Sequence, residues 1–318
     1  MRQLIILLLV APLLVYGQQG PYAPAAGQTG STAIGYGSSR IIDWAGLCTI
    51  ERGYQNVSDT SLGLAFVGNE SAGENESDGS VVSIGDGGIA LLTFNQPISN
   101  TIGADIAVFE NSFSDYFLEL AYVEISSDGI NFFRFPSVSL TNSSVQVNGF
   151  GVLDPTNIYN LAGKYRGGYG TPFDFEELDS IMGLNIDSIS YVRIIDVVGS
   201  VDSGYASYDS QGNVINDPWP TAFASSGFDL DAVAAIGEVT GIEENEVAGI
   251  LIYPNPVINE LFISGIFSFA NIYDVSGDLV KSEYLLNQSI RVAALSQGIY
   301  FIELIGDNQR ITQRFVKL

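Results

Sequence analysis

The strongest constraint on the fold is a two-residue alternation of apolar and polar side chains that recurs along the chain. In residues 117–126 it places Ala121, Val123 and Ile125 on one face of an extended strand, and residues 131–135 return after a turn. The same pattern predicts further strands at residues 89–94, 105–109, 191–196 and 228–236. Because turn residues separate these short strands at close intervals, the sequence predicts an all-β fold, an antiparallel β-sandwich or jelly roll.

Composition divides the chain into five segments. A positive start, an uncharged apolar run and small residues before Gln18 are typical of a secretory signal peptide. That run is too short to span a membrane, and no longer one follows, so we expect no membrane span. The predicted segments are the signal peptide 1–17, a flexible leader 18–40, the main β-sandwich domain 41–237, an acidic linker 238–247 and a small C-terminal β domain 248–318.

The charge of the chain is strongly acidic and unevenly placed. The formal net charge is −24, yet residues 249–318 hold five basic and six acidic residues, so the acidity belongs to the main domain. Such a surface is a poor partner for nucleic acid and for anionic membranes. It is a good partner for cations, calcium above all, although a solvated acidic surface kept for solubility is the alternative.

The chain has no histidine and a single cysteine, Cys48. This excludes a Ser-His-Asp or Cys-His pair, a zinc site containing histidine, and any disulfide within the chain. We therefore expect a protein that is not an enzyme. The alternative is a hydrolase that uses carboxylates alone, as glycosidases do. Glu119 and Glu124 are candidates for it, but their different parity puts them on opposite faces of one strand.

Two aspartates flank Leu230 in the strand predicted at residues 228–236. A two-residue period puts both carboxylates on one face and Leu230 and Ala232 on the other. Carboxylates about 7 Å apart repel unless positive charge lies near them, and calcium takes six to eight oxygen ligands. We hypothesise one structural calcium ion, with ligands drawn from Glu110, Asn111, Asp229 and Asp231. The alternatives are a solvated sheet face and pairing with Arg134 or Arg193.

Residues 160–174 form the most unusual loop, because they combine four glycines with two of the few basic residues. Arginine and tyrosine on a glycine-rich loop can recognise a carboxylate, a phosphate or a sugar. The candidate ligand-binding residues are Lys164, Tyr165, Arg166 and Tyr169, with Trp219 as an aromatic wall. The alternative is a loop folded over the sandwich. An aromatic patch beside these loops would favour binding, and a pocket of converging carboxylates would favour hydrolysis.

Four motifs follow one another in residues 248–318. They include Tyr-Pro-Asn-Pro, Ile-Tyr-Asp-Val-Ser-Gly, Gly-Ile-Tyr-Phe-Ile-Glu-Leu and a final Arg-Phe-Val-Lys-Leu. The set resembles the C-terminal sorting domain of the type IX secretion system of Bacteroidetes-type bacteria. The resemblance implies handling by the type IX machinery and a secreted or outer-surface location once the signal peptide and sorting domain are removed. The residues that carry it are Tyr253, Pro254, Asn255, Pro256, Gly277, Gly298 and Tyr300.

Strings in the main domain resemble a family of secreted bacterial cell surface proteins. They lie at residues 83–88, 107–111, 123–129, 170–174, 193–196 and 227–233. The strand pattern also resembles galactose-binding-like jelly rolls, which often carry structural calcium. Together these imply a non-catalytic surface protein that binds a glycan, a small ligand or a partner receptor. An accessory ligand-capture protein of an outer-membrane uptake system is a further alternative.

Overall fold

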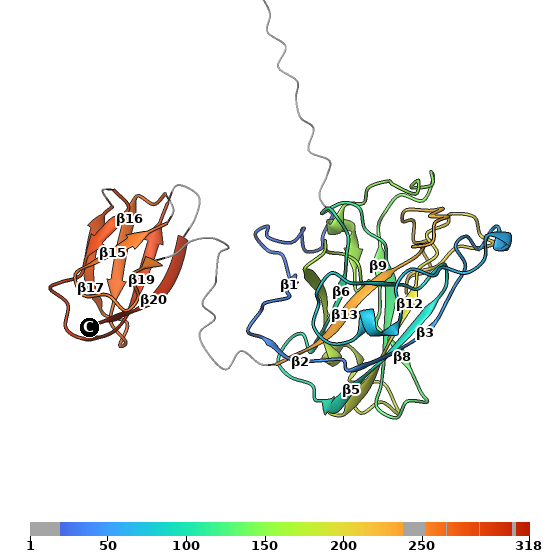
Figure 1. Cartoon of the computed structure of the whole chain (residues 1–318), viewed down its shortest axis with the longest axis horizontal. Coiled ribbons are helices and arrows are strands. Elements are labelled where there is room, and N and C mark those ends of the chain that lie inside the picture. The colour runs from blue at the N-terminus through green and yellow to red at the C-terminus, as the bar shows by residue number, and fades with distance from the viewer. Residues whose placement is uncertain (1–19, 238–251, 265, 286, 307–309) are drawn as a thin grey trace, which may run out of the picture. The chain divides into compact units, whose positions relative to one another are not determined.

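The computed structural model describes residues 20–237, 252–264, 266–285, 287–306 and 310–318. The predicted signal peptide, residues 1–17, and the predicted linker, residues 238–247, lie outside the described residues. Contacts divide the chain into two compact units, a main unit Met1–Glu238 and a C-terminal unit Val239–Leu318 (Figure 1). Both units are built from antiparallel sheets, which confirms the predicted all-β fold.

Two sheets form the main unit, and a two-residue alternation selects the strands of both. The five-stranded sheet runs β3 (Leu47–Glu51), β5 (Ile89–Ile98), β12 (Ile189–Asp196), β7 (Ala121–Ser126) and β8 (Phe133–Arg134). The second sheet runs β1 (Ile34–Gly35), β11 (Tyr169–Phe173), β6 (Ile106–Glu110), β13 (Asp229–Ile236) and β2 (Ile41–Trp44), with β4 (Val82–Ser83) paired to β13. A short ladder joins β9 (Val138–Ser139) and β10 (Ile158–Tyr159).

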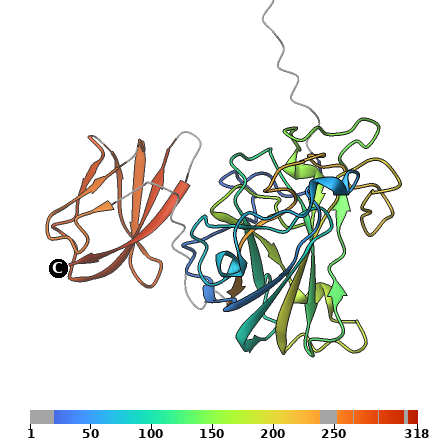
Figure 2. The ribbon, with the colours of Figure 1, turned by 45° about the vertical axis from the view of Figure 1, so that its right-hand side comes forward.

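Helical turns in the described residues are all short and of the 3-10 type. They are η1 (Thr60–Leu62), η2 (Glu70–Gly73), η3 (Pro155–Asn157) and η4 (Phe175–Leu178). Within the same residues no helix is long and apolar enough to cross a membrane. Long loops connect the strands and gather toward the upper end of the main unit in both ribbon views (Figures 1 and 2). These loops carry the candidate site.

The main core lies between the two sheets and is filled from both. Leu92, Val123 and Ile194 point into it from one sheet, and Val108 and Val233 from the other. All five are almost wholly removed from solvent. Burying an aliphatic side chain of this size contributes about 1.5–3 kcal/mol, so the apolar phase of the alternation fixes which face of each strand turns inward.

Strand β13 departs from the predicted alternation. A register shift lies between Leu230 and Ala232 in its pairing with β6, so Asp231 is an extra residue in the ladder. Leu230 packs in the main core, whereas Ala232 packs with Phe109 on the opposite side of the sheet. The prediction that Leu230 and Ala232 share one face is therefore wrong, because the bulge reverses the parity of the strand.

Residues 18–40 were expected to be a flexible leader, and residues 20–40, which the structure describes, lie against this sheet. From residue 20 onward the segment packs on the main unit instead. Tyr22 N donates to the Thr156 carbonyl at 3.0 Å, and β1 pairs with β11. Ile34 packs against Phe109 in the outer apolar cluster. Low charge and small side chains had predicted a flexible segment. Its glycines and alanines instead allow it to pack closely on the sheet.

The C-terminal unit has two sheets of its own. One contains β14 (Ile252–Tyr253), β15 (Glu260–Ile263) and β18 (Ser289–Arg291), and the other contains β17 (Leu279–Tyr284), β16 (Phe269–Tyr273), β19 (Gly298–Ile305) and β20 (Arg310–Lys317). Asn255, between Pro254 and Pro256, ties the first strand to the last. Its side chain accepts from Val316 N at 2.9 Å and donates to the Arg314 carbonyl at 3.1 Å.

Other residues of the sorting motifs also have structural roles. Gly277 has a φ of +86°, which a turn residue other than glycine rarely adopts. The Tyr300 ring is buried and stacks on Phe315 with 5.6 Å between centroids. Tyr253 stacks on Phe262 at 5.8 Å. The motif therefore builds a small self-contained β unit.

Candidate functional site

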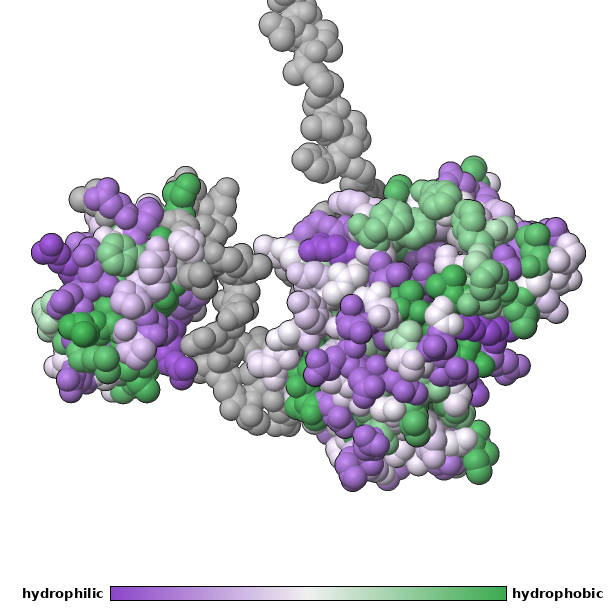
Figure 3. Space-filling model, in the orientation of Figure 1, coloured by the Kyte–Doolittle hydropathy of each residue, from purple (hydrophilic) through white to green (hydrophobic). Residues whose placement is uncertain are grey.

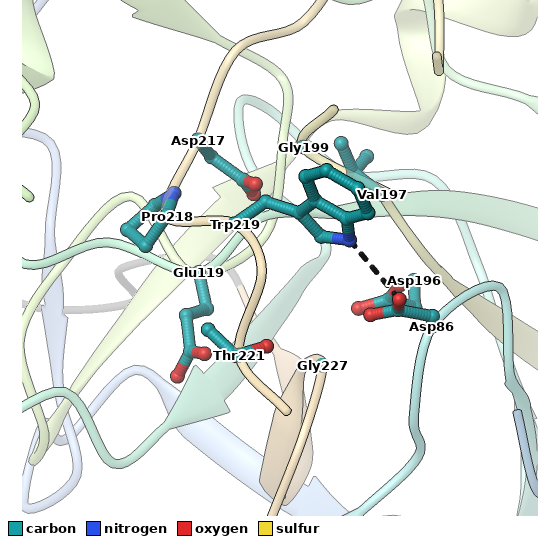
Figure 4. A pocket seen from close by; sticks show the side chains of 10 residues that line it. All are labelled: Asp86, Glu119, Asp196, Val197, Gly199, Asp217, Pro218, Trp219, Thr221 and Gly227. Atoms are coloured by element: carbon teal, nitrogen blue, oxygen red, sulfur yellow. Dashed lines mark hydrogen bonds between the residues drawn. The ribbon is translucent and has the colours of Figure 1, made fainter. Parts of the chain in front are cut away.

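A small pocket in the main unit collects carboxylates from four distant parts of the sequence (Figure 4). Its lining is Asp86, Glu119, Asp196, Val197, Gly199, Asp217, Pro218, Trp219, Thr221 and Gly227. We call it the acidic pocket. Its volume is about 200 Å³ with open solvent at the mouth included, but the room inside is only about that of one water molecule. It can therefore hold a single small polar group.

Asp86 and Asp196 form one wall of the acidic pocket. Asp86 lies in a turn between Gly85 and Gly87, whose φ angles of +78° and +69° favour glycine. Its carboxylate accepts from Val57 N at 2.8 Å, Trp219 Nε1 at 3.1 Å and Ser226 Oγ at 3.3 Å. Asp196 ends β12, and its oxygens accept from Gly87 N and Phe228 N, each at 2.8 Å. Both carboxylates are thus held in fixed orientations.

Asp217 and Glu119 complete the acidic pocket. Asp217 Oδ2 accepts from Leu120 N at 2.9 Å. Asp217 Oδ1 lies so close to Gly199 that an added Cβ there would come within 1.6 Å of it. Glu119 is half-buried, and its carboxylate has no hydrogen bond or ion pair with any described residue. The carboxylate of Glu119 therefore lacks a partner in the folded chain.

The electrostatics of the acidic pocket disfavour its own negative charge. Burial raises the pKa of Asp196 to about 8, and the charge of Asp86 adds to the rise. Burial, followed by the charge of Asp196, raises the pKa of Asp217 well above its usual range. Burial and then the charge of Glu110 do the same to the pKa of Glu119. No described lysine or arginine forms an ion pair with these groups. A proton or an incoming cation would relieve the repulsion.

The predicted calcium ligands lie in an adjoining acidic region but have other partners. Asp229 accepts from Ser83 Oγ, and Asp231 accepts from Ser77 Oγ at 2.5 Å. Glu110 is buried with Oε2 on Ser112 N at 2.8 Å, while its Oε1 has no partner. Burial first, then the charges of Asp229 and Asp231, raise the pKa of Glu110 well above its usual range.

The fourth predicted ligand, Asn111, is exposed, unlike the other three. Across the part of the chain that the structure describes, no group of three or more aspartate, glutamate or cysteine side chains is arranged to hold a metal ion. The bulge in β13 also removes the regular alternation on which the ligand set was based. Calcium itself stays a prediction.

The predicted ligand-binding loop splits into buried and surface parts. Lys164 is buried, with Nζ donating to the Ile158 carbonyl at 2.8 Å. Tyr165 is also buried, and its hydroxyl lies 2.8 Å from Thr32 Oγ1. Arg166 pairs with Asp115 at 2.5 Å and lies over the Tyr169 ring at 4.7 Å. Lys164 and Tyr165 therefore do not face solvent as a binding surface requires, because their polar atoms are used inside the fold.

Trp219 is not grouped with these loop residues. It lines the acidic pocket, where its indole N–H donates to Asp86 (Figure 4). Its ring lies 6.3 Å from the ring of Tyr205, which is partly exposed. Trp219 therefore lies among the carboxylates of the acidic pocket and not beside Arg166 as predicted.

Four phenylalanine rings follow one another along the surface next to the acidic pocket, and the sequence did not identify them as a site. They are Phe113, Phe117, Phe150 and Phe223, with successive ring centroids 4.5, 6.3 and 5.5 Å apart. We call them the aromatic row. Phe117 is 8% exposed, and the other three are 47–74% exposed. Phe117 precedes Glu119 by two residues and Phe223 follows Thr221 by two, so two of the four rings are close in sequence to residues that line the pocket.

The surface view (Figure 3) also shows an apolar area on the main unit. Figure 3 shows apolar side chains gathered toward the end of the main unit that carries the long loops of Figure 1. Two further exposed apolar residues, Val145 and Val152, belong to the segment that carries Phe150. Three aromatic residues within 113–117, set among serine and aspartate turn residues, were the signal available in the sequence, since turn chemistry predicts a loop and a loop exposes its rings.

The two hydrolase candidates occupy different environments. Glu124, on β7, is bound by Arg134 Nε at 2.9 Å and by Arg193 Nε at 2.7 Å. Glu119 lines the acidic pocket. Glu119 precedes β7, so the two residues are not on one strand as the parity argument assumed, and they do not form a pair.

Residues 251–318 match the family model of the secretion system C-terminal sorting domain. The match covers the motifs from Tyr253 to the end of β20, so this part of the chain is a type IX sorting domain, which directs export to the cell surface or beyond it. No curated protein matches the chain.

The chain is similar to several solved structures at low identity. One is PorZ, an essential bacterial surface component of the type IX secretion system of Porphyromonas gingivalis, with 15% identity over 28% of this chain and a TM-score of 0.20. Another is β-glucuronidase of Ruminococcus gnavus, with 11% identity over 87% of this chain and a TM-score of 0.27. A third is HBP35 of P. gingivalis, with 9% identity over 85% of this chain and a TM-score of 0.18. The chain spans 14%, 44% and 63% of those three chains. Likenesses this distant do not bear on its function.

Proposed function

Because the chain carries a type IX sorting domain and is exported to the cell surface or beyond it, we propose that its main unit is a non-catalytic binding module of the cell exterior. The aromatic row carries the proposal. Phenylalanine rings that pack on one another and remain exposed are unusual on a protein with a net charge of −24, and exposed apolar patches mark interaction sites. The occupant that we propose is an apolar, basic segment of a partner protein.

Charge complementarity supports a basic partner. Nearly all of the net charge lies upstream of residue 249, and the acidic pocket beside the row holds four carboxylates without a basic partner in the described residues. A positively charged partner is drawn toward such a surface, and aromatic rings add contact area at low entropy cost. A glycan fits less well, because the room in the pocket is about that of one water molecule.

Converging carboxylates are also what a hydrolase would need, so the two possibilities have to be weighed. A glycosidase holds a sugar ring between two carboxylates and admits water or a nucleophile beside it. The acidic pocket has room for about one small group, and Glu124 is occupied by two arginines. These observations favour binding over hydrolysis.

The test is binding of the purified full chain to intact cells of a strain that lacks it. We compare a row variant, Phe113→Ser with Phe150→Ser and Phe223→Ser, with a control variant, Ile102→Ser with Ile130→Ser and Met182→Ser. The control residues are 82–96% exposed and lie outside the row. The row variant should bind at least tenfold more weakly, and the control should bind like the unaltered chain. Equal binding of the two variants would overturn the proposal.

The class of partner follows from pretreating the cells. Protease treatment should abolish binding if the partner is a protein. Loss of binding after periodate treatment, with binding kept after protease treatment, would replace the protein partner by a glycan.

A structural calcium ion in the adjoining region is a second proposal. The observation that supports it is the buried Glu110 Oε1, which lacks a partner and lies near Asp229 and Asp231. Calcium that binds the folded state raises the melting temperature, and we expect a rise of several degrees relative to chelator. Glu110→Gln should abolish that rise, and an equal rise in both chains would show that the ion binds elsewhere.

A further inference from the structure

We propose that the acidic pocket receives the ammonium group of a lysine side chain belonging to the partner that docks on the aromatic row. This rests on the proposed function and adds the chemical group that the partner presents. Four acidic residues line a space of about one water molecule, and the described residues supply no basic side chain to it. An ammonium group is close to a water molecule in size, and its positive charge is opposite to that of the carboxylates in the pocket.

Two of the acidic residues, Glu119 and Asp217, have carboxylate oxygens that accept no hydrogen bond. Glu119 is half-buried, lines the pocket and has no hydrogen-bond partner among the described residues. Asp217 uses only Oδ2, on Leu120 N. Asp86 and Asp196, by contrast, are already bound by N–H and O–H donors. Asp217 is only 3% exposed, so an oxygen of its carboxylate without a donor is unfavourable and indicates a donor that arrives from outside the chain.

The geometry favours an ammonium group over a metal ion. Calcium draws six to eight oxygens to 2.3–2.6 Å, and no three acidic side chains in the described ranges are arranged for that. An ammonium group instead points three N–H bonds outward, and each reaches an oxygen about 2.8 Å away. The Trp219 ring in the pocket wall adds a cation–π surface (Figure 4). A guanidinium group is planar and larger, so arginine fits the available space less well.

The aromatic row explains why the ammonium should come from lysine. The lysine side chain has a flexible four-carbon stem that packs on apolar surface while its charged end lies elsewhere. Phe117 and Phe223 each lie two residues from a pocket residue, Glu119 and Thr221. A stem that crosses the rings therefore delivers its charge to the acidic pocket.

The test uses Trp219 as a reporter in the full chain. The sequence has two tryptophans, so Trp44→Phe leaves Trp219 alone. The probes are three blocked peptides: acetyl-Phe-Lys-Phe-amide, the same peptide with Nε-acetyl-lysine, and the same peptide with arginine. We expect the fluorescence titration to give a Kd for the lysine peptide at least tenfold lower than for the acetylated one, with arginine in between.

Variants separate the pocket from the row. Glu119→Gln and Asp217→Asn should reduce the tenfold preference for lysine to about twofold or less. The row variant should weaken both peptides together and keep their ratio. Circular dichroism and the melting temperature confirm that each variant is folded.

Three outcomes would overturn the inference. Equal binding of the lysine and acetyl-lysine peptides that still depends on the row leaves the proposed function standing and removes the ammonium from it. Binding of no peptide removes the inference, while the cell assay decides separately on the proposed function. A Trp219 signal that calcium alone produces, and that Asp217→Asn abolishes, would assign the acidic pocket to a metal instead.

Discussion

Glu124 and the acidic pocket are two solutions to the same problem, a carboxylate buried in one β-sheet. Glu124 lies on β7 directly opposite Arg193 on β12 and Arg134 on β8. Three residues further along the same strand pair, Asp196 lies opposite Ala121 and faces other carboxylates. The sheet thus neutralises one buried acid completely and leaves its neighbour without a basic partner among the described residues.

The surroundings of the two sites reinforce this contrast. Arg134 lies over the Tyr122 ring and Arg193 over the Phe132 ring, each at 4.0 Å. The glutamate and its arginines therefore form a closed structural unit with their charges and rings satisfied. In the acidic pocket no described group donates a hydrogen bond to the carboxylate of Glu119. A carboxylate that lacks hydrogen-bond partners and lines a pocket is a candidate binding site, whereas a fully paired carboxylate is a structural ion pair.

The largest expected effect comes from applying the same mutation to both places. Glu124→Gln should lower the free energy of unfolding by about 2–3 kcal/mol, because two arginines lose their anion in a partly buried setting. The arginines keep 31% and 41% side-chain exposure, which holds the loss below that of a fully buried pair. Glu119→Gln should leave the stability unchanged or raise it by up to about 1 kcal/mol, since it removes a repelled charge. Urea unfolding of the full chain measures both.

A matched result would contradict the comparison. If the two glutamine variants lost similar stability, Glu119 would have to be held by the fold as firmly as Glu124 is. Asp115→Asn, which weakens the surface pair with Arg166, serves as a control of small effect.

The strands could be predicted because their signal is local. Residues 121–126, 189–196 and 229–236 alternate or run apolar, and β7, β12 and β13 lie there. The bulge at Asp231 could not be predicted, because an extra residue in one strand shows only against its partner strand. The sorting domain was recognisable for the opposite reason, since its motifs are short, ordered and contiguous.

The acidic pocket could not be predicted because its four carboxylates come from loops and strand ends far apart in the sequence. Asp86 and Asp217 lie in glycine- and proline-containing turns that read as ordinary loops. Only the order of strands brings those turns to Asp196 and Glu119. Lys164 and Tyr165 were predicted to bind a ligand for the opposite reason. The sequence shows that a side chain is polar, but not that its hydrogen-bond partner lies inside the fold.

A smaller effect separates the two places by pH. The pKa of Asp196 is raised to about 8 and that of Asp217 well above its usual range, whereas both titrate near 3.8 when unfolded. Between about pH 4 and pH 8 the folded state therefore holds protons that the unfolded state has released. The stability of the folded state therefore falls as pH rises through this window. Melting curves in chelator and without peptide at pH 5, 6, 7 and 8 should decline accordingly.

Asp217→Asn sharpens the pH comparison, because its one hydrogen bond, from Leu120 N, can be kept by an amide oxygen. The variant should flatten the decline and exceed the parent chain by about 1–2 kcal/mol at pH 8. Asp128 provides the control of opposite sign. Backbone N–H groups of Asn131 and Ile130 lower its pKa, so its contribution is present above the unfolded pKa and is lost only in acid. Asp128→Asn should leave the pH 5–8 slope intact. A parent chain whose stability is flat or rises from pH 5 to pH 8 would mean that the pocket carboxylates are already compensated.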